Sequence, residues 1–288
     1  MTTNQHPASG AWPFATAHRS FGAIAFLCGV CIGSVATQAV ANSRQQSTNQ
    51  SQGSQVDGYR TNAEKGDAVA QLLLGAAYED GDGVPRDYAE AAKWYRKAAD
   101  QGDPLAQISL GLLYLDGRGI AQDSAQSVEW FQKAAEQGDR DGQFYLGLSY
   151  ANGNGVTQDY TEAAKWYRNS ADQGVADAQL NLGAMYDQGR GIPQSSVEAV
   201  QWFRKAAEQG TPMAQANLGF MYGAGSGVAQ DFVAAHQWFN IAAARSSGEQ
   251  QKKYAQYREA LATKMTPVQI ADAEQKAQEW MEAFEKRK

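Results

Sequence analysis

Few residues in this chain of 288 are suited to acid–base or nucleophilic chemistry. Histidine occurs three times, and His236 is the only one after residue 18, while the two cysteines, Cys28 and Cys31, both lie near the start. A Cys–His pair is therefore impossible in most of the chain, and no G-x-S-x-G turn supplies a serine nucleophile for His236. We predict no catalytic residue, no metal site and no cofactor, and we interpret His236 as a surface histidine.

Glycine-rich turns are the other feature that suggests chemistry, because such turns cradle phosphate groups in some proteins. The first turn contains Gly81 and Gly83, but Arg86 stands where a G-x-G-x-x-G loop needs its third glycine, and no strand pattern precedes it. The flanking Asp80 and Asp82 resemble part of a calcium loop, yet the later ligands of such a loop are missing. We interpret this turn and its four later copies as structural turns between helices.

The turns belong to a repeat with a period of 102 − 66 = 36 residues, marked by Gly66, Gly102, Gly138, Gly174 and Gly210. Each copy predicts two helices joined by the glycine turn. The first helix carries Leu-Gly-x-x-Tyr, and a glycine inside a helix predicts close approach of a neighbouring helix. The second helix begins with a capping residue and carries tryptophan followed by another aromatic residue. We expect the repeated tryptophan to anchor the core.

The combined pattern, A-x-x-x-L-G-x-x-Y-x-x-G-x-G-V/I followed by A-x-x-W-x-x-K-A-A-x-x-G, is present from Ala70 to Gly102. This unit resembles the Sel-1-like repeat (SLR) family, which is related to tetratricopeptide repeats. The resemblance implies an all-α fold, a right-handed superhelical solenoid of helix-turn-helix repeats with a C-terminal helical cap. Some cysteine-rich members of that family bind or slowly hydrolyse penicillins, but the S-x-x-K, S-D-N and K-T-G elements of serine β-lactamases do not occur here. We therefore predict that the chain is not an enzyme.

The composition divides the chain into five parts. Residues 1–41 contain an apolar run from Phe21 to Ala41 that ends in Ala-Val-Ala, so they predict a signal peptide, with an N-terminal membrane anchor as the alternative. Residues 42–57 predict a disordered polar linker, 58–65 a degenerate capping half-repeat, 66–247 five repeats, and 248–288 C-terminal capping helices. We expect an exported protein of the periplasm, with an inner-membrane-anchored or secreted protein as the alternatives.

The first helices also carry side chains on the face opposite the repeated leucine and tyrosine. By resemblance to tetratricopeptide solenoids, that face lines a concave groove for an extended or helical peptide. The alternative is that its apolar members pack against the preceding repeat. The candidate groove residues are Leu72, Ile108, Leu112, Phe144, Tyr145, Leu148, Leu180, Asn181, Asn217 and Phe220.

We therefore predict a non-catalytic scaffold of the bacterial cell envelope that binds a protein or peptide. A formal charge of −6 disfavours nucleic acid as a partner, and membrane contact is expected only through residues 21–41 if they are not cleaved. Two alternatives remain open at the level of sequence. One is a cell-wall-associated enzyme or a peptidoglycan- or β-lactam-binding protein, and the other is a secreted host-interaction factor.

Overall fold

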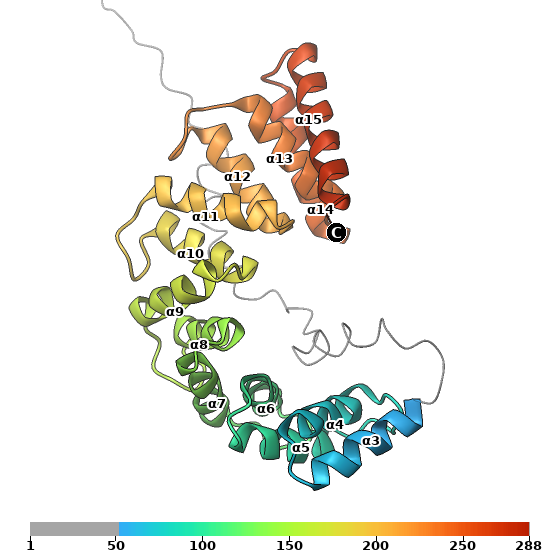
Figure 1. The fold of residues 1–288 in the computed structure, drawn as a ribbon. Helices are drawn as coiled ribbons and strands as arrows, with labels where there is room; N and C mark the ends of the chain where they lie inside the picture. Colours follow the sequence, from blue (N-terminus) through green and yellow to red (C-terminus); the bar gives the residue numbers. More distant parts are fainter. Residues whose placement is uncertain (1–51, 288) are drawn as a thin grey trace, which may run out of the picture. The chain divides into compact units, whose positions relative to one another are not determined.

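The structure, a computed structural model, describes residues 52–287, and within them all regular structure is helical (Figure 1). The all-α class predicted from the sequence is confirmed. The predicted signal segment and most of the predicted linker lie outside the described residues. No described helix combines the length and the apolar character that a membrane span requires.

The chain divides into two compact units, one ending at Ala178 and the other beginning at Gln179. In each unit, most helices that follow one another in sequence pack together. The helices are α3 (Gln52–Glu64), α4 (Ala68–Asp80), α5 (Tyr88–Asp100), α6 (Pro104–Asp116), α7 (Ser124–Glu136), α8 (Arg140–Asn152), α9 (Tyr160–Asp172), α10 (Ala176–Gln188), α11 (Ser196–Glu208), α12 (Pro212–Ala224), α13 (Phe232–Ala244), α14 (Gly248–Ala262) and α15 (Pro267–Glu285).

The ends of the helices follow the capping residues in the sequence. Asp67 accepts a hydrogen bond from the Ala70 amide at the start of α4, and Asp87 accepts from the Ala89 and Glu90 amides at the start of α5. Between them, Gly81 adopts a left-handed φ of 77° and ends α4, a conformation that favours glycine. The predicted structural turn is therefore confirmed at this position.

Close packing of the two helices in a repeat depends on the glycine inside the first helix. A Cβ atom on Gly111 of α6 would lie 2.6 Å from the Phe131 ring of α7, and one on Gly75 would lie equally close to the Tyr95 ring. The predicted close approach is confirmed. The aromatic residue that the glycine accommodates is at most 2% exposed in every repeat: Tyr95, Phe131, Tyr167, Phe203 and Phe239.

The repeated tryptophan is not the main core anchor that the sequence predicted. Only Trp130 and Trp202 are buried, while Trp94, Trp166 and Trp238 are half-buried. The tryptophan precedes the glycine-facing aromatic residue by one position, which rotates it by about 100° around the helix axis. It therefore lies at the margin of the core, where Lys97 reaches over the Trp94 ring with its Nζ 3.7 Å from the ring centre.

The array begins earlier than the sequence indicated. Helix α3 spans Gln52–Glu64, and adding 36 to both bounds gives 88 and 100, the bounds of α5. It is therefore the second helix of a starting half-repeat, as expected, but it begins at residue 52 rather than 58, so residues 52–57 are helical rather than linker. Val56 explains the difference, because it is only 4% exposed and packs with Ala63 and Leu74.

The array ends in two helices that replace a sixth repeat. Helix α14 begins 36 residues after α12, and α15 begins with the predicted capping box, in which Thr266 and Gln269 exchange hydrogen bonds. Helix α15 packs on α13, where the Trp280 and Trp238 rings meet edge to face at 5.9 Å. Their role as C-terminal capping helices agrees with this packing, because α15 covers a side of α13 that would otherwise face water.

Pairs of glutamines, one buried and one exposed, form a ladder that joins successive repeats. Gln107 donates a hydrogen bond to the Ala99 carbonyl of the preceding repeat at 3.2 Å, and its side-chain oxygen accepts one from Gln137 at 2.8 Å. Gln71 and Gln101 make the corresponding pair at 2.7 Å. Because Gln71 and Gln107 are buried, their amides must be satisfied inside the protein, and the exposed Gln101 and Gln137 help to satisfy them while fixing the register between repeats.

Candidate functional site

Six of the candidate groove residues are buried by their own chain: Leu72, Ile108, Leu112, Phe144, Leu180 and Phe220. Leu72 packs with Tyr95 and Ala76, and Ile108 and Leu112 pack around Phe131. Phe220 meets the rings of Phe239 and Tyr257. These six side chains act as core, because the aromatic residues of the second helices already cover them.

The other four candidates, Tyr145, Leu148, Asn181 and Asn217, are half-buried and retain surface for a partner. Tyr145 and Leu148 lie on α8 in the first unit, while Asn181 and Asn217 lie on α10 and α12 in the second. Of the ten candidate groove residues, six therefore belong to the core and four remain available for contact with a partner.

Tyr145 has the most distinctive surroundings of the four. Its ring stacks on Phe131 with the ring centres 5.1 Å apart and contacts Phe144 edge to face at 5.3 Å, so its position is fixed. Burial, together with the negative charges of Asp141, Asp177 and Asp116, raises the pKa of Tyr145 to about 12. The negative charges of three carboxylates from three successive repeats thus act on one aromatic residue.

The pKa values of two of these carboxylates are themselves raised, although Asp141 is half-buried and Asp177 is exposed. Partial burial raises the pKa of Asp141, and the negative charge of Asp139 raises it further. Arg140, whose Nε lies 3.8 Å from the Asp141 carboxylate, lowers it. Partial burial also raises the pKa of Asp177, and among the described residues no cation lies within ion-pair distance of it. Negative charge at this surface is therefore only partly neutralised by the chain itself. We call Tyr145, Asp116, Asp141 and Asp177 the acidic tyrosine site.

A second polar cluster, which the sequence analysis missed, extends from the core to the surface. Tyr95 donates a hydrogen bond to Glu79 at 2.8 Å, and Arg118 from the next repeat lies 3.7 Å from the same carboxylate and 2.7 Å from Asp116. Burial raises the pKa of Glu79, although Tyr95 and Arg118 oppose the shift. Tyr95 and Glu79 are buried whereas Arg118 and Asp116 are partly exposed, so the cluster joins two repeats and Arg118 neutralises part of the charge of Asp116.

The prediction of a surface histidine is wrong, because His236 is only 2% exposed. Helix α13 turns its side chain inward, and burial together with the charge of Arg258 lowers its pKa, while Glu274 of α15 acts in the opposite direction. The error arose because the capping helices α14 and α15, which lie outside the regular repeat, enclose this position. Among the described residues, no group of three potential ligands is placed to hold a metal ion.

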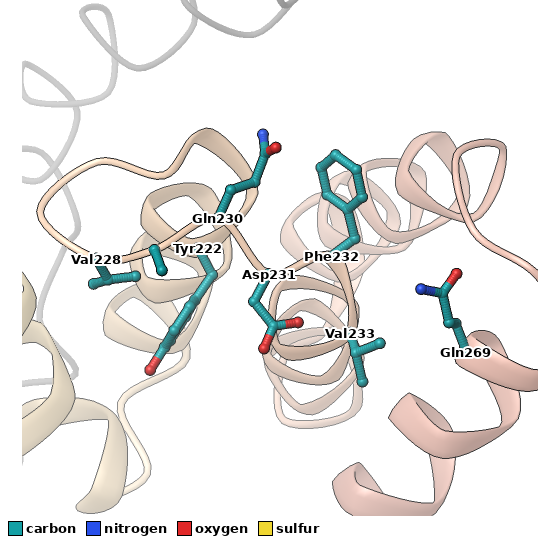
Figure 2. Close-up of a pocket in the computed structure, with 8 residues that line it drawn as sticks. Tyr222, Val228, Gln230, Asp231, Phe232, Val233 and Gln269 are labelled. Atoms are coloured by element: carbon teal, nitrogen blue, oxygen red, sulfur yellow. The ribbon is translucent and has the colours of Figure 1, made fainter.

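A cleft of about 430 Å³ lies in the second unit, between the turn after α12 and the beginnings of α13 and α15 (Figure 2). Its apolar walls include Val228, Phe232 and Val233, and Gln269 of α15 faces them. The polar side chains of its walls already have local partners: Asp231 caps α13 through the Ala234 amide, and Gln269 belongs to the capping box of α15. The cleft therefore offers shape and apolar surface rather than free charge.

Comparison with known proteins identifies the repeat. The Sel1 repeat model matches five consecutive segments, residues 68–103, 104–139, 140–175, 176–211 and 212–247. No curated protein matches the chain.

Two solved structures share sequence and fold with this chain. One is a protective antigen present in uropathogenic Escherichia coli strains that displays an SLR fold, with 34% identity over 92% of this chain and a TM-score of 0.72. The other is a Sel1 repeat protein from Oxalobacter formigenes, with 32% identity over 78% of this chain and 89% of that one, and a TM-score of 0.64. This chain matches 53% of the length of the E. coli antigen.

Proposed function

Because the chain belongs to the Sel1 repeat family, we propose that it is a non-catalytic scaffold of the bacterial cell envelope that binds a protein or peptide. Repeat solenoids of this kind generally present extended surfaces for protein partners. The acidic tyrosine site supports this function most directly, because it joins a rigid aromatic ring to incompletely neutralised carboxylates. Its partner is then a segment that presents lysine or arginine.

The chemistry of the site fits such a side chain. A lysine or arginine cation is attracted to an aromatic ring within about 6 Å of its centre. Carboxylates accept charge-assisted hydrogen bonds from the same cation, and the negative charges of Asp141 and Asp177 act at the Tyr145 side chain where that cation would bind. The ring needs no reorganisation, since Phe131 and Phe144 already hold it.

Panning a randomised peptide library on the purified protein tests this function. We expect the retained peptides to be enriched in lysine and arginine, and their binding to weaken as salt is raised. Replacement of Tyr145 with leucine should abolish the enrichment, whereas Tyr145→Phe, which keeps the ring, should preserve it. Enrichment of neutral or acidic peptides would count against the acidic tyrosine site.

The envelope location rests on the apolar run at residues 21–41 and its Ala-Val-Ala ending. Cell fractionation followed by mass spectrometry of the N-terminus tests it. A mature chain that begins at Asn42 in the periplasm is the expected result. An intact chain in the cytoplasm would exclude export.

A second candidate function is interaction with a host. The observation that favours it is the similarity to the E. coli protein, which is itself described as a protective antigen. Protease treatment of intact cells distinguishes the two functions, because a surface or secreted protein is degraded or found in the medium, whereas a periplasmic scaffold is protected. Saturable hydrolysis of a β-lactam by the purified protein would instead support the cell-wall enzyme.

A further inference from the structure

Arg96 of α5 lies against two aromatic rings of the next repeat. Its guanidinium carbon is 5.4 Å from the centre of the Tyr114 ring and 5.2 Å from the centre of the Trp130 ring, and it donates a hydrogen bond to the Tyr114 hydroxyl. Lys133 approaches the same tryptophan, with its Nζ 3.6 Å from the ring centre. Because cations are attracted to the faces of aromatic rings, Trp130 thus holds two cations of its own chain.

The arginine contact recurs along the array. The tyrosine and the tryptophan are present in all five repeats, and the arginine position holds Arg60, Arg96, Gln132, Arg168 and Arg204. Arg60 donates a hydrogen bond to the Tyr78 hydroxyl at 3.3 Å, and Arg204 donates one to the Tyr222 hydroxyl at 2.6 Å. Gln132 is therefore the exception in an otherwise regular row of arginines.

In the third repeat, Trp166 lacks both of the cations that the tryptophan of the second repeat holds. Gln132 replaces the arginine, and its amide instead donates a hydrogen bond to Glu136 of its own helix at 2.7 Å. Asn169 replaces the lysine that lies three residues after the tryptophan. Lys165 is 5.9 Å from the centre of the Trp166 ring, but it already forms an ion pair within α9. The face of this tryptophan is thus less well supplied with cations than that of its counterpart.

The two aromatic residues of the third repeat are held in place and remain accessible. Tyr150 and Trp166 both pack against the core cluster that contains Phe131 and Leu146, and both are half-buried. Because Gln132 stands at the arginine position, the Tyr150 hydroxyl lacks the arginine donor that its counterparts have. We call Tyr150 and Trp166 the aromatic pair.

The charge beside the aromatic pair also differs from that of the first repeat. On α5, Lys93 and Arg96 lie three residues apart on one face, whereas the corresponding residues of α7 are Glu129 and Gln132. Glu136 follows one turn after Gln132, and both glutamates are exposed. Two cations of the first repeat are thus replaced by an acidic and a neutral side chain. The face of α7 at this position favours a cation that comes from outside the chain.

We propose that the aromatic pair is a binding site for an arginine side chain of a partner protein. The occupant follows from Arg96, which contacts the same two ring positions one repeat earlier. Arginine fits better than lysine, because its planar guanidinium stacks on a ring while it donates a hydrogen bond to the Tyr150 hydroxyl. Glu129 and Glu136 supply the opposite charge. The site is separate from the acidic tyrosine site, since Tyr145 and Tyr150 point about 140° apart around α8.

Titration of the tripeptide acetyl-Gly-Arg-Gly-amide into the full chain tests the site by NMR. The readout is the indole N–H signal of Trp166, which the Trp166→Phe variant identifies. We expect a saturable shift of this signal, and binding of the lysine analogue that is weaker by about fivefold or more. Gln132→Arg supplies a guanidinium from the chain itself, so it should weaken binding of the arginine peptide by a similar factor. Gln132→Ala should bind as the unchanged protein does.

Ala125→Arg is the charge-matched control, since the exposed Ala125 lies on the same face of α7 about 10 Å before Gln132. It should retain binding. Asp141→Asn/Asp177→Asn, which changes only the acidic tyrosine site, should still show the Trp166 shift, so the two sites fail independently. Thermal melting checks that each variant is folded. No saturable shift of Trp166, unchanged binding to Gln132→Arg, or equal weakening by Ala125→Arg would overturn the proposal.

Discussion

Replacement of Gly111 with alanine should destabilise the protein even though alanine is the better helix former. The propensity of alanine favours α6 by about 1 kcal/mol. The added Cβ, however, would lie 2.6 Å from the Phe131 ring, whereas carbon atoms pack best at about 3.5–4.0 Å. Phe131 is 1% exposed and stacks on Tyr145, so it cannot move away freely. Overpacking of this kind costs about 1–3 kcal/mol, which leaves a net loss of about 1 kcal/mol.

Gly58→Ala in α3 is the matched control, because no atom lies within 4 Å of the position that its Cβ would occupy. It should stabilise the protein by about 0.5–1 kcal/mol. Urea unfolding followed by circular dichroism measures both variants. A second change, Phe131→Leu, should reduce the cost of Gly111→Ala, since it shortens the clashing side chain. If Gly111→Ala were as stabilising as Gly58→Ala, the inferred packing of helix against helix would be refuted.

Three further predictions concern buried polar groups. Burial raises the pKa of Glu79 above 4.5. The stability that protonated Glu79 contributes is therefore present below pH 4.5 and is lost as the pH rises through the folded-state pKa. Glu79→Gln should reduce this dependence of the unfolding free energy on pH, measured by urea unfolding at several pH values. The pKa of His236 is lowered, so stability should fall as pH drops below 6.5, and His236→Gln should remove that loss. Gln107→Leu should cost about 1–2 kcal/mol, because the two hydrogen bonds that Gln107 makes to neighbouring repeats are lost, although the Ala99 carbonyl keeps the Gly102 amide and Gln137 is exposed; no loss in calorimetric melting would contradict the ladder.

The repeat itself was predictable from the sequence, because its signals are local. The capping aspartates, the turn glycines and the 36-residue period each act within one unit or on its immediate neighbour. The glycine inside the first helix also gave a correct prediction, since a residue that weakens a helix needs a packing reason. The glutamine ladder has the same period, but the sequence analysis did not identify it, because hydrogen bonds between repeats depend on how the helices stack.

The predictions failed where contacts outside the regular period decide burial. His236 is enclosed by capping helices, and α3 is extended by the burial of Val56. The candidate site was only partly predictable for a related reason. Tyr145 was identified from its position, whereas the carboxylates around it come from three repeats, and their approach depends on how the helices stack.

The most direct test of the binding function is the affinity of one selected lysine-containing peptide for three forms of the protein. The unchanged protein is compared with Asp141→Asn/Asp177→Asn and with the control Asp100→Asn/Asp172→Asn, which removes the same charge from exposed ends of second helices. We predict at least tenfold weaker binding for the first variant only, with unchanged melting, because the peptide cation contacts the acidic tyrosine site. Equal affinity for all three proteins would contradict the proposed function of that site.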